Sequence, residues 1–234
     1  MDTQDSLWIM KIRSIAEQLR GPGVTESFVG LLLTTSDDIL ARNTEGVDWA
    51  KGRELESTIL LKMLCAEYWI ERAGITGQAE KHLGSVIALI DRRGNDNPEL
   101  VGWRILARIM QSFCPLLEIE KYLGRAGGVG EDWVAHQSRL NSKARATLDA
   151  AKNEFYDKGA SDVKLNKQIR LGLSMAEIFL ARYGTAPFVP THELFLLIHE
   201  HEKKFGDDDL QVPLPQMERI PECMAGVLRQ RPET

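Results

Sequence analysis

The stretch that decides the fold is residues 48–73, DWAKGRELESTILLKMLCAEYWIERA. Its apolar side chains recur at helical spacing in two separate sets. The first set is Leu55, Ile59, Met63, Ala66 and Ile70, and the second is Leu61, Leu64, Cys65, Tyr68 and Trp69. A helix that is apolar on two faces packs against neighbours on two sides. We therefore expect this helix to be the centre of the fold.

Helical spacing continues on both sides of this stretch. Trp8, Ile12, Ile15 and Leu19 form one apolar stripe, which Gly21-Pro22-Gly23 terminates. The run from Thr25 to Thr34 predicts a second helix, and Ser36 is expected to cap a short third one that ends at Asn43. The later predicted helices are 76–93, 98–113, a further short one to about Gly124, 132–158, 161–183, 191–205 and a short one that begins at Pro221. Pro115 is expected to end or kink the helix that precedes it.

No segment alternates apolar and polar residues between turn signals as a strand does. The sequence therefore predicts an all-α fold, a compact multi-helix bundle of about eight to ten helices. The expected domain organisation is a single helical domain over 1–205. An acidic, proline-containing C-terminal tail with a short helix follows over 206–234.

Two of the long predicted helices begin alike, with Gly46-Val47-Asp48-Trp49 and Gly130-Glu131-Asp132-Trp133. Each runs to a glycine, Gly74 or Gly159, and a second helix follows. The pattern has two explanations, a pair of related helical hairpins or the same capping chemistry used twice, because any helix favours Asp at its start and Gly at its end.

The composition is that of a soluble globular protein, with 43% hydrophobic residues and a formal net charge of −5. Cys65, Cys114 and Cys223 stand far apart, which argues against a disulfide framework or a zinc knuckle and favours a reducing compartment. The N-terminus lacks the apolar core of a signal peptide, and no apolar run approaches the ~20 residues that span a bilayer. We expect a cytoplasmic protein without a membrane partner.

Two features invite a ligand-binding interpretation that their details oppose. The glycine-rich segment from Gly124 to Trp133 fits neither phosphate-loop spacing, and Glu131 and Asp132 would repel an anion there. His192, His199 and His201 do not share one helix face at the spacing that metal sites use. The sequence thus predicts no catalytic residue, no cofactor and no metal ion.

A narrow acidic stripe, Glu56, Glu67 and Glu71, accompanies the apolar faces of the central helix. The favoured interpretation is a stripe that faces solvent. The alternative pairs it with Arg104 and Arg108, one turn apart on another buried helix, in an ion-pair network or a polar pocket. Carboxylates held away from water have raised pKa values, which is how acid–base sites are made.

The middle of the chain is basic, because residues 101–185 hold 13 Lys and Arg against 9 Asp and Glu. Long basic side chains often just cover apolar edges with their stems, but one shared surface could contact nucleic acid. The residues that would make such contacts within 133–184 are Arg139, Lys143, Arg145, Lys152, Lys167 and Arg170.

Three functions of different classes remain. The favoured one is a non-catalytic helical interaction protein, a subunit or adaptor that binds a protein partner, because every catalytic template fails. The alternatives are a nucleic-acid-associated factor that uses the basic middle, and a ligand-binding protein or enzyme with its polar site near the acidic stripe and Arg104. The sequence defines no oligomeric state.

Overall fold

The computed structural model describes residues 3–41, 53–71, 75–93, 97–125, 131–159 and 163–183. Within these ranges the fold is a bundle of seven α-helices and no strands, so the all-α prediction is confirmed there. The helices are α1 (Thr3–Arg20), α2 (Glu26–Ala41), α3 (Glu54–Glu71), α4 (Thr76–Arg93), α5 (Pro98–Arg125), α6 (Glu131–Lys158) and α7 (Val163–Tyr183). The helices expected at 191–205 and after Pro221 lie outside the described residues, as does the 206–234 tail.

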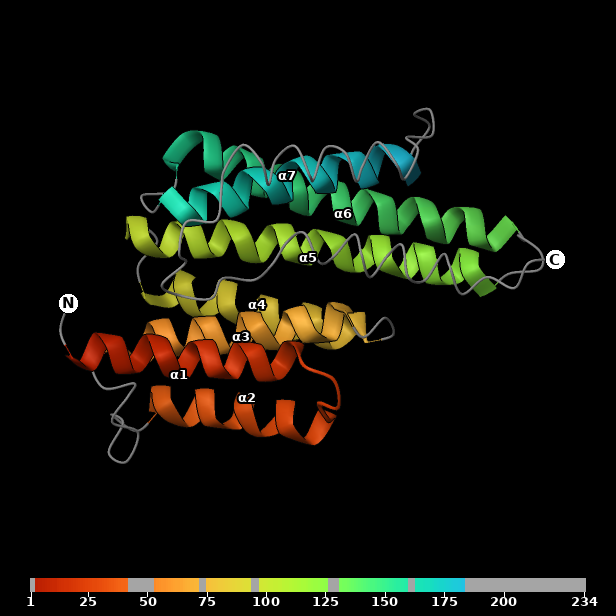
Figure 1. The fold of residues 1–234 in the computed structure, drawn as a ribbon. Coiled ribbons are helices and arrows are strands. Elements are labelled where there is room, and N and C mark those ends of the chain that lie inside the picture. The colour runs from red at the N-terminus through yellow and green to blue at the C-terminus, as the bar shows by residue number, and fades with distance from the viewer. Residues whose placement is uncertain are drawn as a thin grey trace.

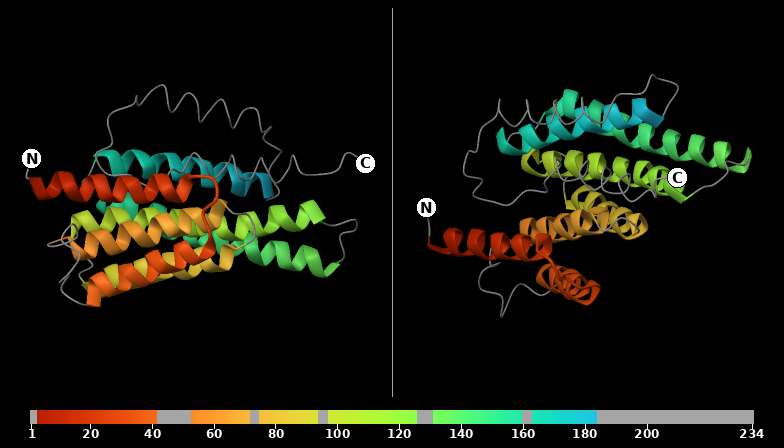
Figure 2. Two further views of the ribbon diagram at one scale, coloured as in Figure 1. Left: turned by 60° about the horizontal axis from the view of Figure 1, so that its bottom comes forward. Right: turned by 45° about the vertical axis from the view of Figure 1, so that its right-hand side comes forward.

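The helices α1 and α2 both pack on α3, with α2 outermost, and the helices α6 and α7 both pack on α5 (Figure 1). In Figure 1 and in the right-hand view of Figure 2, α1 and α2 lie at one end of the stack and α6 and α7 at the other. The helix α4 joins the two parts, because it packs extensively on both α3 and α5. None of the seven helices is long and apolar enough to cross a bilayer.

The helix α3 is buried on all sides, as its two apolar faces predict. Every residue from Ser57 to Ile70 is buried, including the polar ones, and α3 contacts α1, α2, α4 and α5. A second buried helix, α5, contacts α4, α6 and α7 and is almost fully buried from Leu100 to Leu117. The bundle therefore has two central helices, of which the sequence predicted the first as central and the second only as buried.

The break expected before Ser36 is wrong, because α2 continues through it. Val29, Leu32, Ser36 and Ile39 form one buried stripe at helical spacing. The Ser36 hydroxyl bonds to the Leu33 carbonyl oxygen at 2.7 Å inside the helix, and the Ser36 carbonyl accepts a hydrogen bond from Thr58 Oγ1 at 3.0 Å. These bonds satisfy the polar groups of a buried serine without ending the helix.

The helix end expected at Pro115 is also wrong, because α5 runs from Pro98 to Arg125 with Pro115 inside it. A proline within a helix costs about 3 kcal/mol, since it removes one backbone hydrogen bond and crowds the preceding turn. Leu116, Leu117 and Ile119 are all buried just beyond it. Each such burial contributes about 1.5–3 kcal/mol, which offsets the cost of the proline.

The two proposed hairpins are not packed alike. The helices α3 and α4 form a close pair, whereas α6 and α7 each pack more extensively on α5 than on each other. Gly46-Val47-Asp48-Trp49 and Gly74 lie outside the described residues.

The helix α1 rests on α3 through one apolar stripe and a buried hydrogen bond. The Trp8 indole Nε1 donates to Ser57 Oγ at 2.8 Å, and both residues are almost fully buried. Because water cannot replace the lost acceptor, Ser57→Ala is expected to lower the free energy of unfolding by about 1–3 kcal/mol. Urea denaturation measures this loss. The exposed Ser138→Ala is the control, and equal stability of the two variants would contradict the role given to Ser57.

Candidate functional site

The acidic stripe of the central helix does not face solvent as a whole. Glu67 is only 3% exposed, while Glu56 is about one-third exposed and pairs with Arg53 on the preceding turn at 2.7 Å. The side chain of Glu71 lies outside the described residues. The solvent-facing interpretation is therefore wrong for Glu67. This residue lies on the face of α3 that packs against α1, and it is buried there.

Glu67 forms a two-pronged ion pair with Arg20, in the last turn of α1. Arg20 Nε lies 3.0 Å from Glu67 Oε1 and Arg20 Nη2 lies 3.1 Å from Glu67 Oε2. This fork-to-carboxylate geometry is the strong form of a charge-assisted hydrogen bond. The pair also satisfies a carboxylate that would otherwise be very costly to bury.

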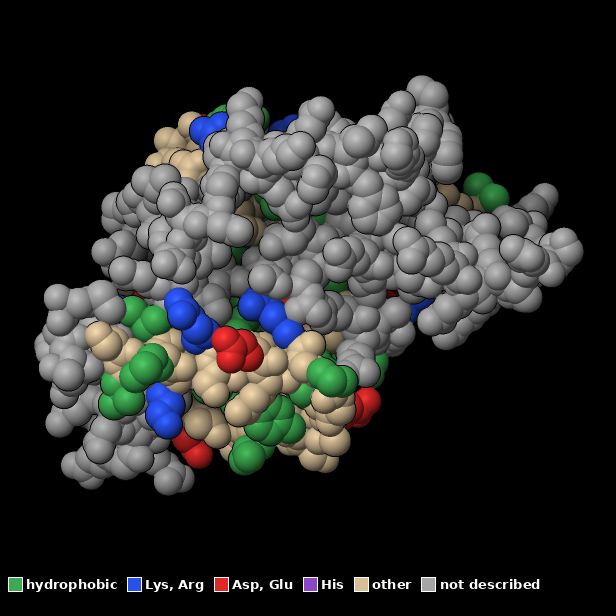
Figure 3. Space-filling view, viewed as in Figure 1, with side chains coloured by type: hydrophobic (Ala, Val, Ile, Leu, Met, Phe, Trp, Pro, Cys, Tyr) green, Lys and Arg blue, Asp and Glu red, His purple; other side chains and the backbone are tan. Residues whose placement is uncertain are grey.

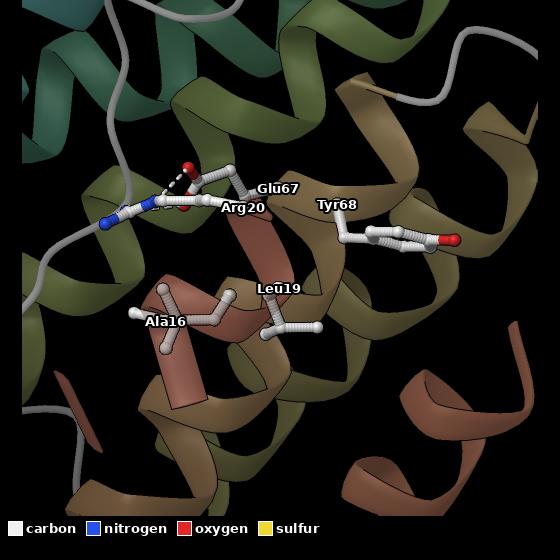
Figure 4. Close-up of a pocket in the computed structure, with 6 residues that line it drawn as sticks. Ala16, Leu19, Arg20, Glu67 and Tyr68 are labelled. Atoms are coloured by element: carbon white, nitrogen blue, oxygen red, sulfur yellow. Dashed lines mark hydrogen bonds and ion pairs between the residues drawn. The ribbon is translucent and has the colours of Figure 1, made fainter. Parts of the chain in front are cut away.

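The Arg20–Glu67 pair borders a hollow between α1 and α3 (Figure 4). The other lining residues are Ala16, Leu19, Leu64 and Tyr68. The hollow leaves no enclosed space for a water-sized molecule, and its walls are mostly apolar. Its geometry is that of a helix-packing seam with one ion pair at its edge.

Arg104 and Arg108 of α5 converge on Glu154 of α6. Arg104 Nε donates to Glu154 Oε1 at 2.9 Å, and Nη2 of Arg104 and Nη1 of Arg108 also bond to the same carboxylate. Arg104 Nη1 reaches Asp91 of α4 at 2.6 Å. We call Asp91, Arg104, Arg108 and Glu154 the three-helix network, because it ties α4, α5 and α6 together.

The three-helix network buries charge but balances it. Arg104 is 4% exposed, and the two guanidinium groups of this group of four are matched by its two carboxylates. Burial alone would lower the pKa of the Arg104 guanidinium, but the hydrogen bonds with Glu154 and Asp91 outweigh burial and leave that pKa raised. A guanidinium held in its charged form stabilises packing and donates no proton.

The ion-pair network expected from the sequence is therefore divided. Glu67 pairs with Arg20, while Arg104 and Arg108 pair with Glu154. The sequence missed Glu154 because an acid close to Asp149 and Asp157 on a long amphipathic helix looks like one more solvated residue. Its position one residue before the buried Phe155 was the available signal.

The basic residues proposed for nucleic-acid contact do not act as one free positive surface. Lys143 bonds to both oxygens of Glu80 at 2.7 and 2.8 Å, and Lys152 pairs with Glu177. Arg139 bonds to the His136 ring at 2.7 Å. The pairing with carboxylates neutralises two of the six charges that the sequence had grouped.

The other members of that group are placed differently. Arg145 is exposed on α6. Arg170 bonds to Asn166 at 2.8 Å and its guanidinium lies 5.3 Å from the centre of the Phe155 ring. The side chain of Lys167 lies outside the described residues. Arg170 thus covers an apolar edge, as long basic side chains often do.

An aromatic pair that the sequence did not reveal joins the ends of α5 and α6. The rings of Tyr122 and Trp133 stack with centroids 3.6 Å apart and planes 8° apart. His136 lies 5.5 Å from Trp133, and its Nε2 is 3.9 Å from a Glu118 carboxylate oxygen. Trp133 is buried, so the pair closes this end of the helix packing.

The thiols in the described ranges are unreactive. Burial raises the pKa of Cys65 to about 12 and raises that of Cys114 further, so both remain protonated at neutral pH. In those same ranges no three His, Cys, Asp or Glu side chains gather as metal ligands. The glycine-rich segment around residue 128 and the residues His192, His199 and His201 lie outside the described residues.

A buried lysine lies between α2, α3 and α4. Lys62 is 7% exposed, and its ammonium pairs with Asp37 of α2 at 2.7 Å. The half-buried His82 of α4 lies in the field of this lysine. Burial lowers the pKa of His82, Lys62 and Lys81 lower it further, and Asp37 opposes them. His82 is therefore held neutral in the folded protein.

The lowered pKa of His82 predicts an acid sensitivity. Because the unfolded chain binds this proton more tightly, stability falls as the pH drops below about 6.5, the ordinary histidine pKa, and the loss ends below the folded-state pKa. The difference in unfolding free energy between wild type and His82→Gln is expected to shrink or reverse in that window. Urea titrations from pH 8 to pH 5 measure it, and a constant difference would contradict the assignment.

Comparisons with protein-family models, with curated proteins and with solved structures found no match. The function is therefore inferred from the residues themselves. Among the described residues, the buried charges are paired with one another across helix seams, and the largest uncommitted features are the apolar side chains on the outer faces of the helices.

Proposed function

We propose that this chain is a non-catalytic helical interaction protein that binds a protein partner through the outer faces of α1 and α2. The observation that carries the proposal is the exposure of two large apolar side chains there. Met10 of α1 is 61% exposed and Leu31 of α2 is 63% exposed, and the exposed Leu7 lies one turn from Met10. We call Leu7, Met10 and Leu31 the outer apolar set.

The outer apolar set does not belong to the core-facing stripes of its helices. The core stripe of α1 holds Trp8 and Ile12, and that of α2 holds Val29 and Leu32, all of them buried. Each helix therefore keeps apolar side chains on a face that the bundle does not use. Large apolar side chains that the bundle leaves exposed, as on α1 and on α2, are a feature of protein–protein interaction sites.

The surface around Leu31 is poor in charge, whereas Lys11, Arg13 and Glu17 are exposed near Met10. In Figure 3, hydrophobic side chains, in green, lie over α1 and α2 among tan groups, with several charged side chains, in blue and red, between them. On α2 the exposed neighbours of Leu31 include Ser27, Gly30 and Thr34. Low charge and small neighbours reduce the desolvation cost of docking and let a partner approach closely.

The same features weigh against the two alternative functions. A catalytic polar site near Arg104 would need an uncommitted acid or base, whereas Glu154 and Glu67 are each held by guanidinium groups. A nucleic-acid surface would need free cations, whereas Lys143 and Lys152 are paired with acids. We place the proposed function in the cytoplasm, since free cysteines suit a reducing compartment.

The test compares capture of host proteins by the full chain and by outer-face variants. Met10→Ser and Leu31→Ser, combined, are expected to abolish recovery of a partner that wild type captures, without lowering Tm. Val134→Ser is the matched control, because Val134 is 61% exposed on α6, away from this surface. Equal recovery by all three proteins would contradict the proposal.

A further inference from the structure

We propose that α1 also binds in trans: the face of α3 that α1 covers is a site for the α1 helix of a second copy of this chain. Reciprocal exchange of the two helices would give a dimer. The proposal concerns the inner face of α1, so it is independent of the outer apolar set. It rests on how α1 is attached, how it is connected and how specific its contacts are.

The helix α1 is attached chiefly to one neighbour. It is the first of the seven described helices, and its main packing partner among them is α3. Its buried stripe of Trp8, Ile12, Ala16 and Leu19 is formed by one face of one helix. A single helix that contributes one face can be replaced by an identical helix without any change in the rest of the core.

Polar contacts at both ends of the seam define the helix that fits it. Trp8 donates to Ser57, and the Arg53 guanidinium lies 4.6 Å from the centre of the Trp8 ring. Three turns later, the Arg20 guanidinium donates two hydrogen bonds to the Glu67 carboxylate. Position 8 of α1 meets position 57 of α3, and position 20 meets position 67, so residue numbers rise in the same direction along both helices. The helix α1 therefore runs parallel to α3.

These contacts select the occupant by its chemistry. It must carry an apolar stripe, an indole donor at one end and a guanidinium three turns on, in parallel register. Among the described helices, α1 meets these requirements, so a second copy of the chain supplies a helix that matches them. The buried negative charge of Glu67 rejects helices that lack the cation.

The connection to α2 can act as a hinge. The helix α1 ends at Arg20, and Gly21, Pro22 and Gly23 follow, with Gly23 in the left-handed region at φ 87°. Exchange changes only the backbone angles of this short segment, and short constrained hinges favour it. The tether keeps α1 at high effective concentration near its own α3, so exchange is expected at high protein concentration.

A charge-reversal pair tests the exchange directly. Arg20→Glu and Glu67→Lys each place like charges in the seam of a single chain, and each variant alone is expected to lose on the order of 10 °C in Tm. After exchange between the two variants, both seams hold opposite charges. The equimolar mixture, incubated concentrated, is expected to form a heterodimer with near wild-type Tm. The proposal would be overturned if every species in the mixture is monomeric and the melting curve of the mixture equals the sum of the curves of the two separate variants.

A second variant covers the case in which a reversed charge prevents folding. Deleting residues 22–23 shortens the hinge so that α1 cannot fold back on its own α3, while exchange remains open. Light scattering is expected to give a dimer with wild-type helix content by circular dichroism. A monomer with reduced helix content would show that the seam accepts α1 only within one chain and would overturn the proposal.

Discussion

Glu154→Gln is expected to lower the free energy of unfolding by about 3 kcal/mol, because it leaves the buried Arg104 and its neighbour Arg108 with the charge of Asp91 alone. Glutamine keeps the shape of the side chain and removes only the charge. Chemical denaturation measures the loss. This result would show that the three-helix network is a structural tie and that its carboxylate is committed to packing.

The control for Glu154 is Glu177→Gln on α7. Glu177 also pairs with a basic residue of α6, Lys152, but it is half exposed. Solvent-exposed ion pairs contribute about 0–1 kcal/mol, so this variant is expected to be nearly as stable as wild type. If the two substitutions lower the free energy of unfolding equally, burial does not distinguish the two ion pairs. That result would contradict the structural role given to the three-helix network.

Phe113→Ala is expected to cost about 3–5 kcal/mol, the range for removing a fully buried aromatic side chain. Phe113 lies on α5, and its ring meets Phe179 of α7 edge to face with centroids 6.0 Å apart. The loss combines the cavity with this aromatic contact. The measurement tests whether α5 is a second central helix and not one of several equivalent outer ones.

Tyr156→Ala on α6 is the matched aromatic truncation for Phe113→Ala. Tyr156 is exposed, so its removal is expected to change stability by no more than about 0.5 kcal/mol. Urea denaturation measures both values from the midpoints, provided that the slope of unfolding free energy against urea concentration is unchanged in each variant. If Phe113→Ala costs less than about 1 kcal/mol, the packing of α5 against α7 is not as described.

Helix type and most helix ends could be predicted because they depend on local signals. The helices α4 and α5 begin at the expected residues, Thr76 and Pro98, and α6 ends before Gly159, which has a positive φ. The errors at Ser36 and Pro115 have one cause, whereas the start of α3 at Glu54, after the non-helical Arg53 and not at Asp48, is a separate error. Local breaking signals were outweighed by burial of the residues that follow them, and burial depends on tertiary contacts.

The partners of the charged residues could not be predicted for the same reason. Helical spacing correctly marks Arg104 and Arg108 as neighbours on a buried face. The choice between Glu67 and Glu154 as their partner depends on which helices lie across from α5, and spacing within one helix holds no information about that. The pairing of Arg20 with Glu67, 47 positions apart in the chain, likewise needed the three-dimensional arrangement.

The central claim, that the outer faces of α1 and α2 bind a protein partner, is tested most directly by photo-crosslinking in the native host. A photoreactive amino acid is placed at position 10, 31 or 134 of the full chain, three sites of closely matched exposure. We expect positions 10 and 31 to label the same protein and position 134 to leave it unlabelled. Labelling that is absent at positions 10 and 31, or no stronger there than at position 134, would contradict the claim.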